Sequence, residues 1–363
     1  MKQEKPAYLA LYEALRQEIT DGAWPYGARL PSRRQLAHER GLSAVTVEHS
    51  YELLCQEGYV EARPRSGMFV AYRAADGFAQ SENAGTRRPP VPQASPAEAI
   101  PFTVLARAMR RVLSDYAEAI LNKPPNAGCG ELRAAIARYL ARNRGIRVDA
   151  EQIVIGSGAE YLYGLIVEML GRERVFAIES PSYEKIEQVY RARGVDCELL
   201  PLGPDGILSS ALAGTRASLL HITPFRSYPS GVTASASKRM EYLRWAAAEE
   251  RYIVEDDFES EFSLLRKPEE TVFSLSERPN VIYMNSFSRT VSPSLRTGYM
   301  VLPRTLLPLF RERVGFYSCT VPAFEQYVLA DLLENGDFER HINRIRRQER
   351  KKAREMGGSG ERG

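Results

Sequence analysis

The residues best suited to chemistry lie in one turn that follows the apolar segment Val281–Met284. Ser286, Ser288 and Arg289 form this turn, and Arg296 comes seven residues after Arg289. Small hydroxyl groups and spaced guanidinium groups at the end of a strand offer hydrogen-bond donors to a phosphate with little bulk. The sequence therefore predicts a phosphate-binding turn at this position.

Two other turns place polar groups directly after apolar segments. The small-residue turn from Gly156 to Glu160 lies between a strand-like and a helical segment. Its backbone N–H groups and the helix dipole favour an anion, although such a turn alone is weak evidence of a site. The apolar segment Tyr252–Glu255 ends in Asp256 and Asp257. The residues alone allow the carboxylate at position 256 to pair with a ligand cation or to face water.

Helical and strand-like segments alternate after Pro101, and these elements must position the turns. The predicted helices are Glu131–Asn143, Ala159–Leu170, Tyr183–Arg193 and Ser235–Glu250. The predicted strands are Gln152–Ile155, Arg174–Ile178, Cys197–Leu200, Ser218–Ile222, Tyr252–Glu255, Val281–Met284 and Gly298–Leu302. Strands that alternate with helices predict a mostly parallel sheet with helices on both faces.

Residues 1–72 show a different pattern, three short helices followed by two short strands. The first helix has apolar residues at helical spacing, namely Tyr8, Leu11, Leu15 and Ile19. Ser32 is placed to cap the second helix, and Gln35 is placed to complete a capping box. The strands are predicted at Tyr59–Ala62 and Met68–Val70. Three helices and a hairpin predict a winged helix-turn-helix.

Composition and length bound the class of protein. The 363 residues exceed what one hydrophobic core usually serves, so we expect two domains. A net charge of +3 gives no overall attraction to nucleic acid, and the four cysteines lack metal or redox spacing. No signal sequence or long apolar run is present, which predicts a cytoplasmic protein. Residues 73–100, rich in Ala, Gly, Ser and Pro, are predicted to be a linker.

The N-terminal segment resembles the GntR-type winged helix. The resemblance rests on Leu30-Pro31-Ser32-x-Arg34, Gly41-Leu42-Ser43-x-x-Thr46, Glu57-Gly58-Tyr59-Val60 and Ser66-Gly67-x-Phe69-Val70, which occur in order. It implies that the segment binds double-stranded operator DNA through Arg34, Ser43, Thr46 and Gly67. Many relatives carry arginine directly after the serine, whereas this chain has alanine at position 44. The departure removes a guanidinium that would discriminate guanine by about 1–3 kcal/mol.

The remainder resembles the aminotransferase-like domain of the MocR/GabR subgroup, which has the fold of fold-type I pyridoxal 5'-phosphate (PLP) enzymes. The fold class implied is thus a multidomain chain, a winged helix-turn-helix plus an α/β PLP-dependent transferase-like large domain at 101–334. The resemblance implies cofactor contacts from Gly158, Ala159, Glu160, Tyr183, Asp256, Ser286, Ser288 and Arg296. Tyr183 would lie on the pyridine ring, and the carboxylate at position 256 would pair with the ring nitrogen.

Several departures from the family cluster in this half. Arg289 occupies the position of the Schiff-base lysine, and a guanidinium has no neutral amine to condense with an aldehyde. Phe258 replaces a tyrosine that would bind the ring hydroxyl, and Phe225-Arg226-Ser227 replaces Ser-His-Gln. Residues 335–363 are interpreted as the start of a truncated C-terminal subdomain, which in relatives supplies an arginine for the ligand carboxylate.

These features favour a homodimeric DNA-binding regulator whose second domain senses an amino-acid or PLP effector. We expect PLP to bind at most without a covalent bond, with no catalytic residue, no metal and no membrane association. Two alternatives stay open from the sequence. One is a PLP-dependent aminotransferase-like enzyme with an accessory DNA domain, and the other is a non-functional truncated relative.

Overall fold

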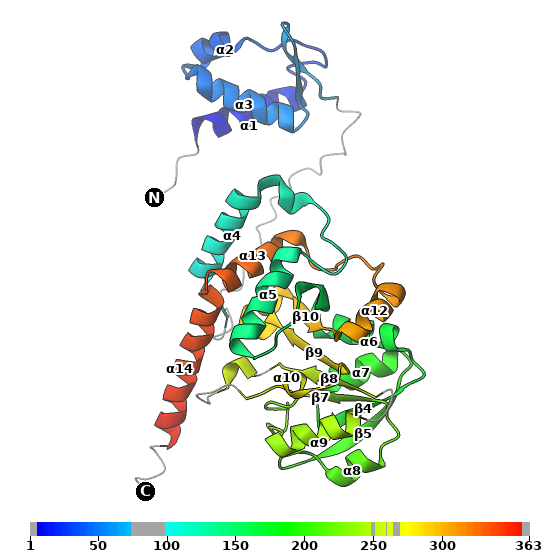
Figure 1. Ribbon diagram of the computed structural model, residues 1–363. Helices are drawn as coiled ribbons and strands as arrows, with labels where there is room; N and C mark the ends of the chain where they lie inside the picture. The colour runs from blue at the N-terminus through cyan, green and yellow to red at the C-terminus, as the bar shows by residue number, and fades with distance from the viewer. Residues whose placement is uncertain (1–5, 74–98, 248–250, 259, 264–268, 358–363) are drawn as a thin grey trace. The chain divides into compact units, whose positions relative to one another are not determined.

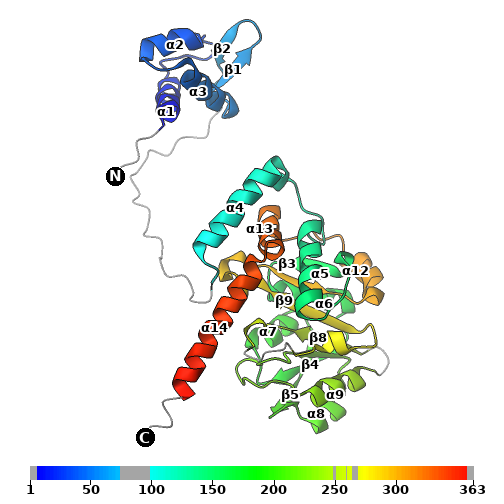
Figure 2. The same ribbon diagram turned by 60° about the vertical axis from the view of Figure 1, so that its left-hand side comes forward.

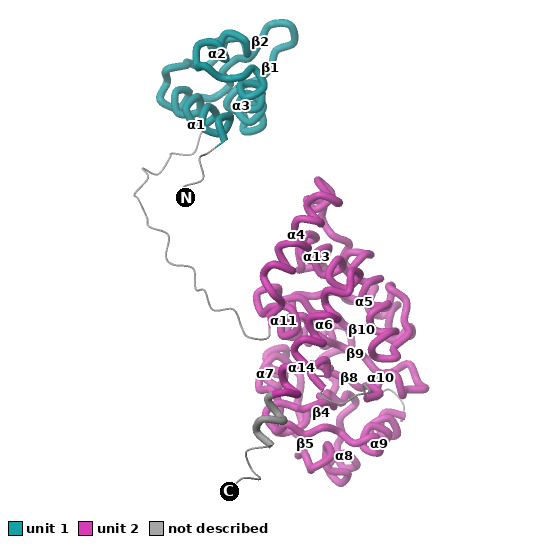
Figure 3. Tube along the Cα trace, turned by 90° about the vertical axis from the view of Figure 1, so that its left-hand side faces the viewer, with its two compact units in different colours: residues 1–92 teal, residues 93–363 magenta. Residues whose placement is uncertain are grey.

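The computed structural model describes residues 6–73, 99–247, 251–258, 260–263 and 269–357, and it forms two compact units. Unit 1 comprises residues 1–92 and unit 2 comprises residues 93–363 (Figure 3). Most of the predicted linker, residues 74–98, lies outside the described residues. Each unit is described separately below.

Unit 1 consists of three helices and a two-stranded antiparallel hairpin (Figure 1). Its elements are α1 (Ala7–Thr20), α2 (Arg33–Arg40), α3 (Ala44–Gln56), β1 (Val60–Arg63) and β2 (Gly67–Val70). Helix α3 packs against both α1 and α2. Apolar residues spaced along each helix form one buried core, which includes Leu15, Leu36, Val47 and Leu54. The predicted three helices and hairpin are therefore confirmed.

Side-chain caps fix where α2 and α3 begin. Ser32 Oγ accepts a hydrogen bond from the backbone N–H of Gln35 at 3.3 Å, so the predicted cap at Ser32 is confirmed. The predicted capping box is wrong, because Gln35 Nε2 donates to Glu39 at 2.9 Å rather than turning back to Ser32. Ser43 caps α3 in the same way, through the N–H of Thr46 at 3.1 Å.

Unit 2 is built on an eight-stranded sheet with the order β3-β10-β9-β8-β7-β4-β5-β6. The strands are β3 (Ile153–Gly156), β4 (Val175–Ser180), β5 (Asp196–Gly203), β6 (Gly206–Ile207), β7 (Leu219–Ile222), β8 (Tyr252–Asp256), β9 (Val281–Ser286) and β10 (Gly298–Val301). The four pairings from β9 to β5 are parallel, which confirms the predicted mostly parallel sheet. β10 runs antiparallel to both β3 and β9, because the connection from β9 is too short for a crossover helix.

Alternate residues of the strands face two helical layers (Figures 1 and 2). In β3, Val154 packs into one core while Ile153 and Ile155 pack into another. The first layer contains α6 (Ala159–Leu170), α7 (Glu184–Ala192) and α12 (Leu307–Arg313). The second contains α4 (Phe102–Tyr116), α5 (Gly130–Asn143), α8 (Ser209–Gly214), α9 (Ala236–Ala246), α10 (Val272–Leu275), α11 (Phe287–Thr290), α13 (Ala323–Glu334) and α14 (Asp337–Gly357). The predicted cover on both faces is therefore confirmed.

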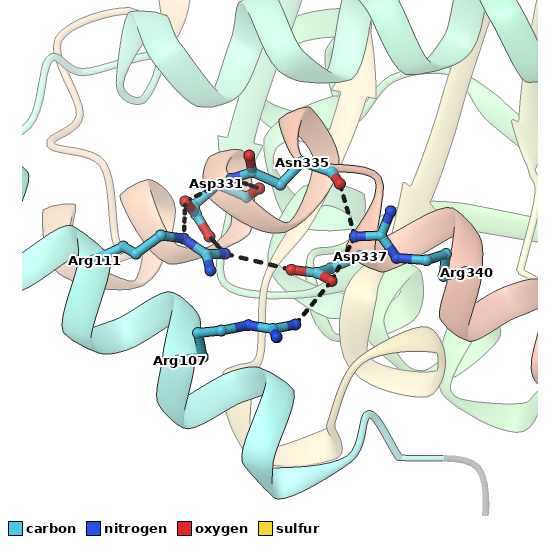
Figure 4. A network of polar contacts seen from close by, with 6 residues as sticks. All are labelled: Arg107, Arg111, Asp331, Asn335, Asp337 and Arg340. Atoms are coloured by element: carbon cyan, nitrogen blue, oxygen red, sulfur yellow. Dashed lines mark hydrogen bonds and ion pairs between the residues drawn. The ribbon is translucent and has the colours of Figure 1, made fainter.

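An ion network joins three helices of the second layer (Figure 4). Asp337, at the start of α14, has a side chain only 5% exposed and contacts Arg107 at 3.3 Å, Arg111 at 3.3 Å and Arg340 at 2.7 Å. Arg111 also contacts Asp331 of α13 through Nε at 3.0 Å and Nη2 at 2.5 Å. The network holds the ends of α13 and α14 against α4, which the sequence analysis did not predict.

Candidate functional site

A cavity of about 420 Å³ opens in unit 2 where the strands end. Its wall combines side chains that follow β4, β7, β8 and β9 with the first residues of α6. The lining residues are Ala159, Glu160, Tyr163, Tyr183, Ile186, Thr223, Tyr228, Asp256, Phe258, Ser286, Ser288, Arg289 and Arg296. In open α/β sheets ligands bind at the carboxyl ends of the strands, so this is where a site is expected.

The lining of this cavity includes residues that were predicted to bind a phosphate. Ser286, Ser288 and Arg296 line it, although Ser286 is largely buried. Gly158 has a φ of +93°, and a Cβ there would come within 3.3 Å of the Arg296 guanidinium. A glycine is therefore required for the close approach of Arg296 to α6. The N–H of Gly158 donates to Gly156 O at 2.8 Å, so the groups left for an anion begin at Ala159.

Asp256 also lines the cavity, and its side chain is fixed by a tyrosine. Its Oδ2 accepts a hydrogen bond from Tyr163 Oη at 2.5 Å and lies 3.8 Å from Nε2 of His221. Burial, and then the Asp256 carboxylate, raise the pKa of Tyr163 well above its ordinary value, so its hydroxyl stays a donor. His221 is oriented in turn by Tyr190, at 2.7 Å from Nδ1. This arrangement presents a buried carboxylate that can bind a ligand cation.

A buried ion pair lies next to Asp256. Asp257 Oδ2 contacts Arg144 at 2.6 Å and accepts from Tyr283 Oη at 2.7 Å. Glu255, one residue earlier, accepts from the N–H groups of Val272 and Phe273. Burial raises the pKa of Glu255 to about 8. The carboxylates at the end of β8 therefore have different surroundings: Asp256 lines the cavity, whereas Glu255 and Asp257 are bonded within the protein core.

Aromatic rings and Arg289 complete the wall. The guanidinium carbon of Arg289 lies 5.7 Å from the Phe258 ring centre and 5.0 Å from that of Phe262, within the range of cation–π contact. Tyr183 is 41% exposed and meets Tyr228 edge-on, with 6.5 Å between ring centres. The cavity thus brings together seven of the eight predicted cofactor contacts. The eighth, Gly158, lies next to the guanidinium group of Arg296.

The predicted DNA contacts lie on the surface of unit 1. Ser43 and Arg34 are exposed, and Ser43 Oγ is 2.8 Å from Thr46 Oγ1 at the start of α3. Gly67 begins β2 with a φ of +112°, and a Cβ there would lie 3.2 Å from Nε of Arg29. Gly67 therefore gives the Arg29 side chain room beside the hairpin. Val45, which the sequence analysis did not single out, is 60% exposed at the start of the same helix.

Comparison with known proteins identifies both units. Residues 7–70 match the family described as bacterial regulatory proteins, gntR family, and residues 94–357 match aminotransferase class I and II. The chain is 31% identical to the uncharacterized HTH-type transcriptional regulator YdeL of Bacillus subtilis, over 96% of this chain and 77% of that protein. It belongs to the MocR-type GntR transcription regulators. The probable rhizopine catabolism regulatory protein MocR of Rhizobium meliloti is 29% identical over 94% of this chain and 74% of its own length.

Solved aminotransferases share the fold of the regulator's second unit. LysN, the alpha-aminoadipate aminotransferase of Thermus thermophilus, is 27% identical with a TM-score of 0.63, covering 73% of this chain and 68% of its own. An archaeal alanine:glyoxylate aminotransferase is 24% identical with a TM-score of 0.62, and 63% of its chain is covered, against 68% of this chain. The regulator therefore spans under two thirds of that enzyme. The N-terminal helix-turn-helix and the fold-type I domain are as expected.

Sequence reasoning missed Tyr163, which lines the regulator's cavity, and two residues that contact its wall: Lys185, which contacts Glu160, and His221, which lies near Asp256. Tyr163 and Lys185 lie in helices, and their sequence surroundings do not distinguish them from other helical residues. His221 is the one polar residue in the strand-like segment 219–222. A histidine inside a buried apolar strand was the available signal. Tyr163 and Lys185 carried no signal, since their partners Asp256 and Glu160 are 93 and 25 residues away.

Other classes of site find little support in the part of the chain that the structure describes. No helix there is long and apolar enough to cross a membrane. Among the same residues, no three or more His, Cys, Asp and Glu side chains are grouped so that they could hold a metal ion. The four cysteines of the regulator form no disulfide, and Cys129 and Cys197 are buried.

Proposed function

We propose that this regulator binds operator DNA through unit 1 and uses the aminotransferase-like unit 2 as an effector sensor and dimerisation domain. The effector would be PLP or an amino acid, and PLP would be held without a covalent bond and without turnover. One observation carries the proposal: the cavity wall contains Arg289 where the resemblance places the Schiff-base lysine. A guanidinium stays protonated in proteins and is not a nucleophile.

The other residues of the cavity fit PLP. Ser286, Ser288 and Arg296 would hold its phosphate, and Tyr183 would cover one face of its ring. The buried carboxylate of Asp256, fixed by Tyr163, would bind the protonated ring nitrogen. When bound, PLP supplies an electron sink, which a turnover enzyme uses and a sensor does not. About 420 Å³ is within the range of ligand pockets.

For unit 1 we propose that α3 enters the major groove. Ser43 and Thr46 at its start are the proposed contacts there, with Arg34 on a phosphate and Gly67 at the hairpin. A single winged helix binds weakly, whereas two in a homodimer gain avidity from two half-sites. Such a regulator acts where the operator is, in the cytoplasm.

The absence of a covalent bond is tested by spectra of the wild-type chain and Arg289→Lys after incubation with PLP. We expect the visible absorption band of covalently linked PLP in the variant alone, because only lysine supplies an amine at this position. Calorimetry should show that the wild-type chain binds PLP as well. Borohydride trapping of PLP at the cavity of the wild-type chain would overturn the proposal and favour the enzyme. Absence of PLP binding to both proteins would refute the sensor.

DNA binding and dimerisation need separate measurements. A gel shift on the regulator's own promoter region should give specific retention that weakens as salt rises. Arg34→Ala should weaken retention uniformly across sequences, because a phosphate contact carries no base information. Sedimentation should give a dimer at micromolar concentration. A monomer that retains the promoter with full affinity would contradict the dimer.

A further inference from the structure

The cavity wall already contains an acidic side chain beside Arg296. Glu160 lies in the first turn of α6, and its two oxygens contact two different cations. Oε1 accepts from Lys185 Nζ at 2.7 Å, and Oε2 lies 3.5 Å from Arg296 Nη2. The hydrogen bond from Lys185 lowers the pKa of Glu160, against the smaller effect of burial. Glu160 is therefore ionised at neutral pH.

A carboxylate at this position competes with a ligand phosphate for the same partners. The helix N-terminus favours one negative charge near Ala159, and Glu160 supplies it when no ligand is present. A phosphate on Arg296 would bring a second anion within a few ångströms of Glu160. The repulsion would reduce the affinity for phosphate but not for the ring.

The two contacts of Glu160 differ in length, and this difference assigns a role to Lys185. The 2.7 Å bond to Lys185 is a good charge-assisted hydrogen bond, whereas 3.5 Å to Arg296 is a loose contact. Lys185 thus draws the carboxylate away from Arg296. It also lies beside Tyr183, with Nζ 6.0 Å from the ring centre.

We propose that Glu160 is an internal competitor of the ligand phosphate at Arg296, and that Lys185 is a positioning residue that limits this competition. The inference rests on the proposed function, since it takes the ligand to be a phosphorylated pyridine. It gives the cavity a specificity element: Glu160 sets how strongly a phosphorylated ligand is preferred over its dephosphorylated form. Because Glu160 weakens the contact between the ligand phosphate and Arg296 without removing it, the ligand can both bind and dissociate, as a reversible sensor requires.

The test uses pyridoxine 5'-phosphate and pyridoxine, which have no aldehyde and cannot react with surface lysines. Calorimetry on the full chain measures both ligands with wild type, Glu160→Gln, Lys185→Gln and the double variant. We expect Glu160→Gln to bind pyridoxine 5'-phosphate about tenfold more tightly, with pyridoxine unchanged. Lys185→Gln should weaken the phosphorylated ligand about fivefold in the wild-type background but under about twofold beside Glu160→Gln.

Glu184→Gln is the matched control, because Glu184 is exposed, neighbours Lys185 in sequence and does not line the cavity. It removes the same charge without touching Arg296, so both affinities should stay within about twofold. An equal gain for both ligands in Glu160→Gln, or an equal loss from Lys185→Gln in both backgrounds, would overturn the inference alone. If none of the variants bound pyridoxine 5'-phosphate, the proposed function would fail together with the inference.

Discussion

The ion pair of Arg144 and Asp257 beside the cavity allows a strong prediction about what holds unit 2 together. The two side chains are 5% and 0% exposed, and 2.6 Å separates Nη2 from Oδ2. Burial lowers the pKa of Arg144, but Asp257 together with Tyr283, Glu261 and Glu255 outweighs burial and raises the pKa above its ordinary value. Arg144 is therefore charged in the folded state. Removing either side chain would leave the other buried without its ion-pair partner.

Arg144→Met removes the cation and fills most of its volume. It leaves Asp257 as a buried carboxylate that accepts a hydrogen bond from Tyr283 and has Glu255 and Glu261 nearby. Breaking a buried pair in this way costs about 3–5 kcal/mol. Adding Asp257→Asn removes the second charge, and the amide oxygen can still accept from Tyr283. The double variant should therefore recover about 2 kcal/mol relative to Arg144→Met.

Urea unfolding of unit 2 can be followed without interference from unit 1. The chain has two tryptophans, and Trp245 lies in the core of unit 2 while Trp24 belongs to unit 1. In a Trp24→Phe background the fluorescence change reports unit 2 alone. A loss below about 1 kcal/mol in Arg144→Met would refute the reasoning. So would a double variant no more stable than Arg144→Met, because the cost would then not come from an unpaired charge.

Three further outcomes are expected. Val45→Ser should weaken operator binding about fivefold in gel shifts, by loss of an apolar contact to a thymine methyl, without changing unit 1 melting; unchanged affinity would exclude that contact. Asp337→Asn should destabilise unit 2 by about 2 kcal/mol in urea, because three arginines lose their shared anion. Those arginines lower the pKa of Asp337 against the opposing effect of burial, so the wild-type chain should lose this contribution to stability as the pH falls below the ordinary aspartate value of 3.8. Burial raises the pKa of Glu261 from 4.5 to about 7, so its contribution to stability should be lost as the pH rises from 4.5 through 7. The urea midpoint of the Glu261→Gln variant should therefore fall less over this pH range than the midpoint of the wild-type chain.

The residues alone indicated a phosphate-binding turn after the segment Val281–Met284, and the family resemblance supplied the other predicted contacts that the cavity contains. Ser286 ends β9 and Asp256 ends β8, and parallel pairing of these strands brings the two turns together. No knowledge of side-chain packing is needed for that conclusion. By contrast, the contact of Lys185 with Glu160 depends on how α7 packs on α6, which local sequence does not encode.

Helix α4 was missed although its signal was present. Leu105, Ala108, Met109 and Val112 recur at helical spacing within Phe102–Tyr116, just after the proline-rich segment. The helix begins at Phe102, directly after the predicted boundary between the linker and the large domain. The sequence analysis interpreted Pro101 only as the mark of that boundary. Its partners, α13 and the start of α14, lie more than 200 residues further along the chain. Its place in the fold could not have been inferred locally.

A sensor without a covalent bond differs physically from an enzyme that retains one. Covalent attachment keeps a site occupied regardless of the free ligand, whereas a non-covalent site fills in proportion to concentration relative to Kd. Occupancy changes DNA binding only if the ligand binds the DNA-competent and DNA-free states with different affinities. That coupling is reciprocal, so operator DNA must change the ligand's affinity by the same factor. Under the proposed function, Arg289 would stand in place of the Schiff-base lysine and remove the route to turnover, while Asp256 and Arg296 in the cavity wall would still hold the ligand.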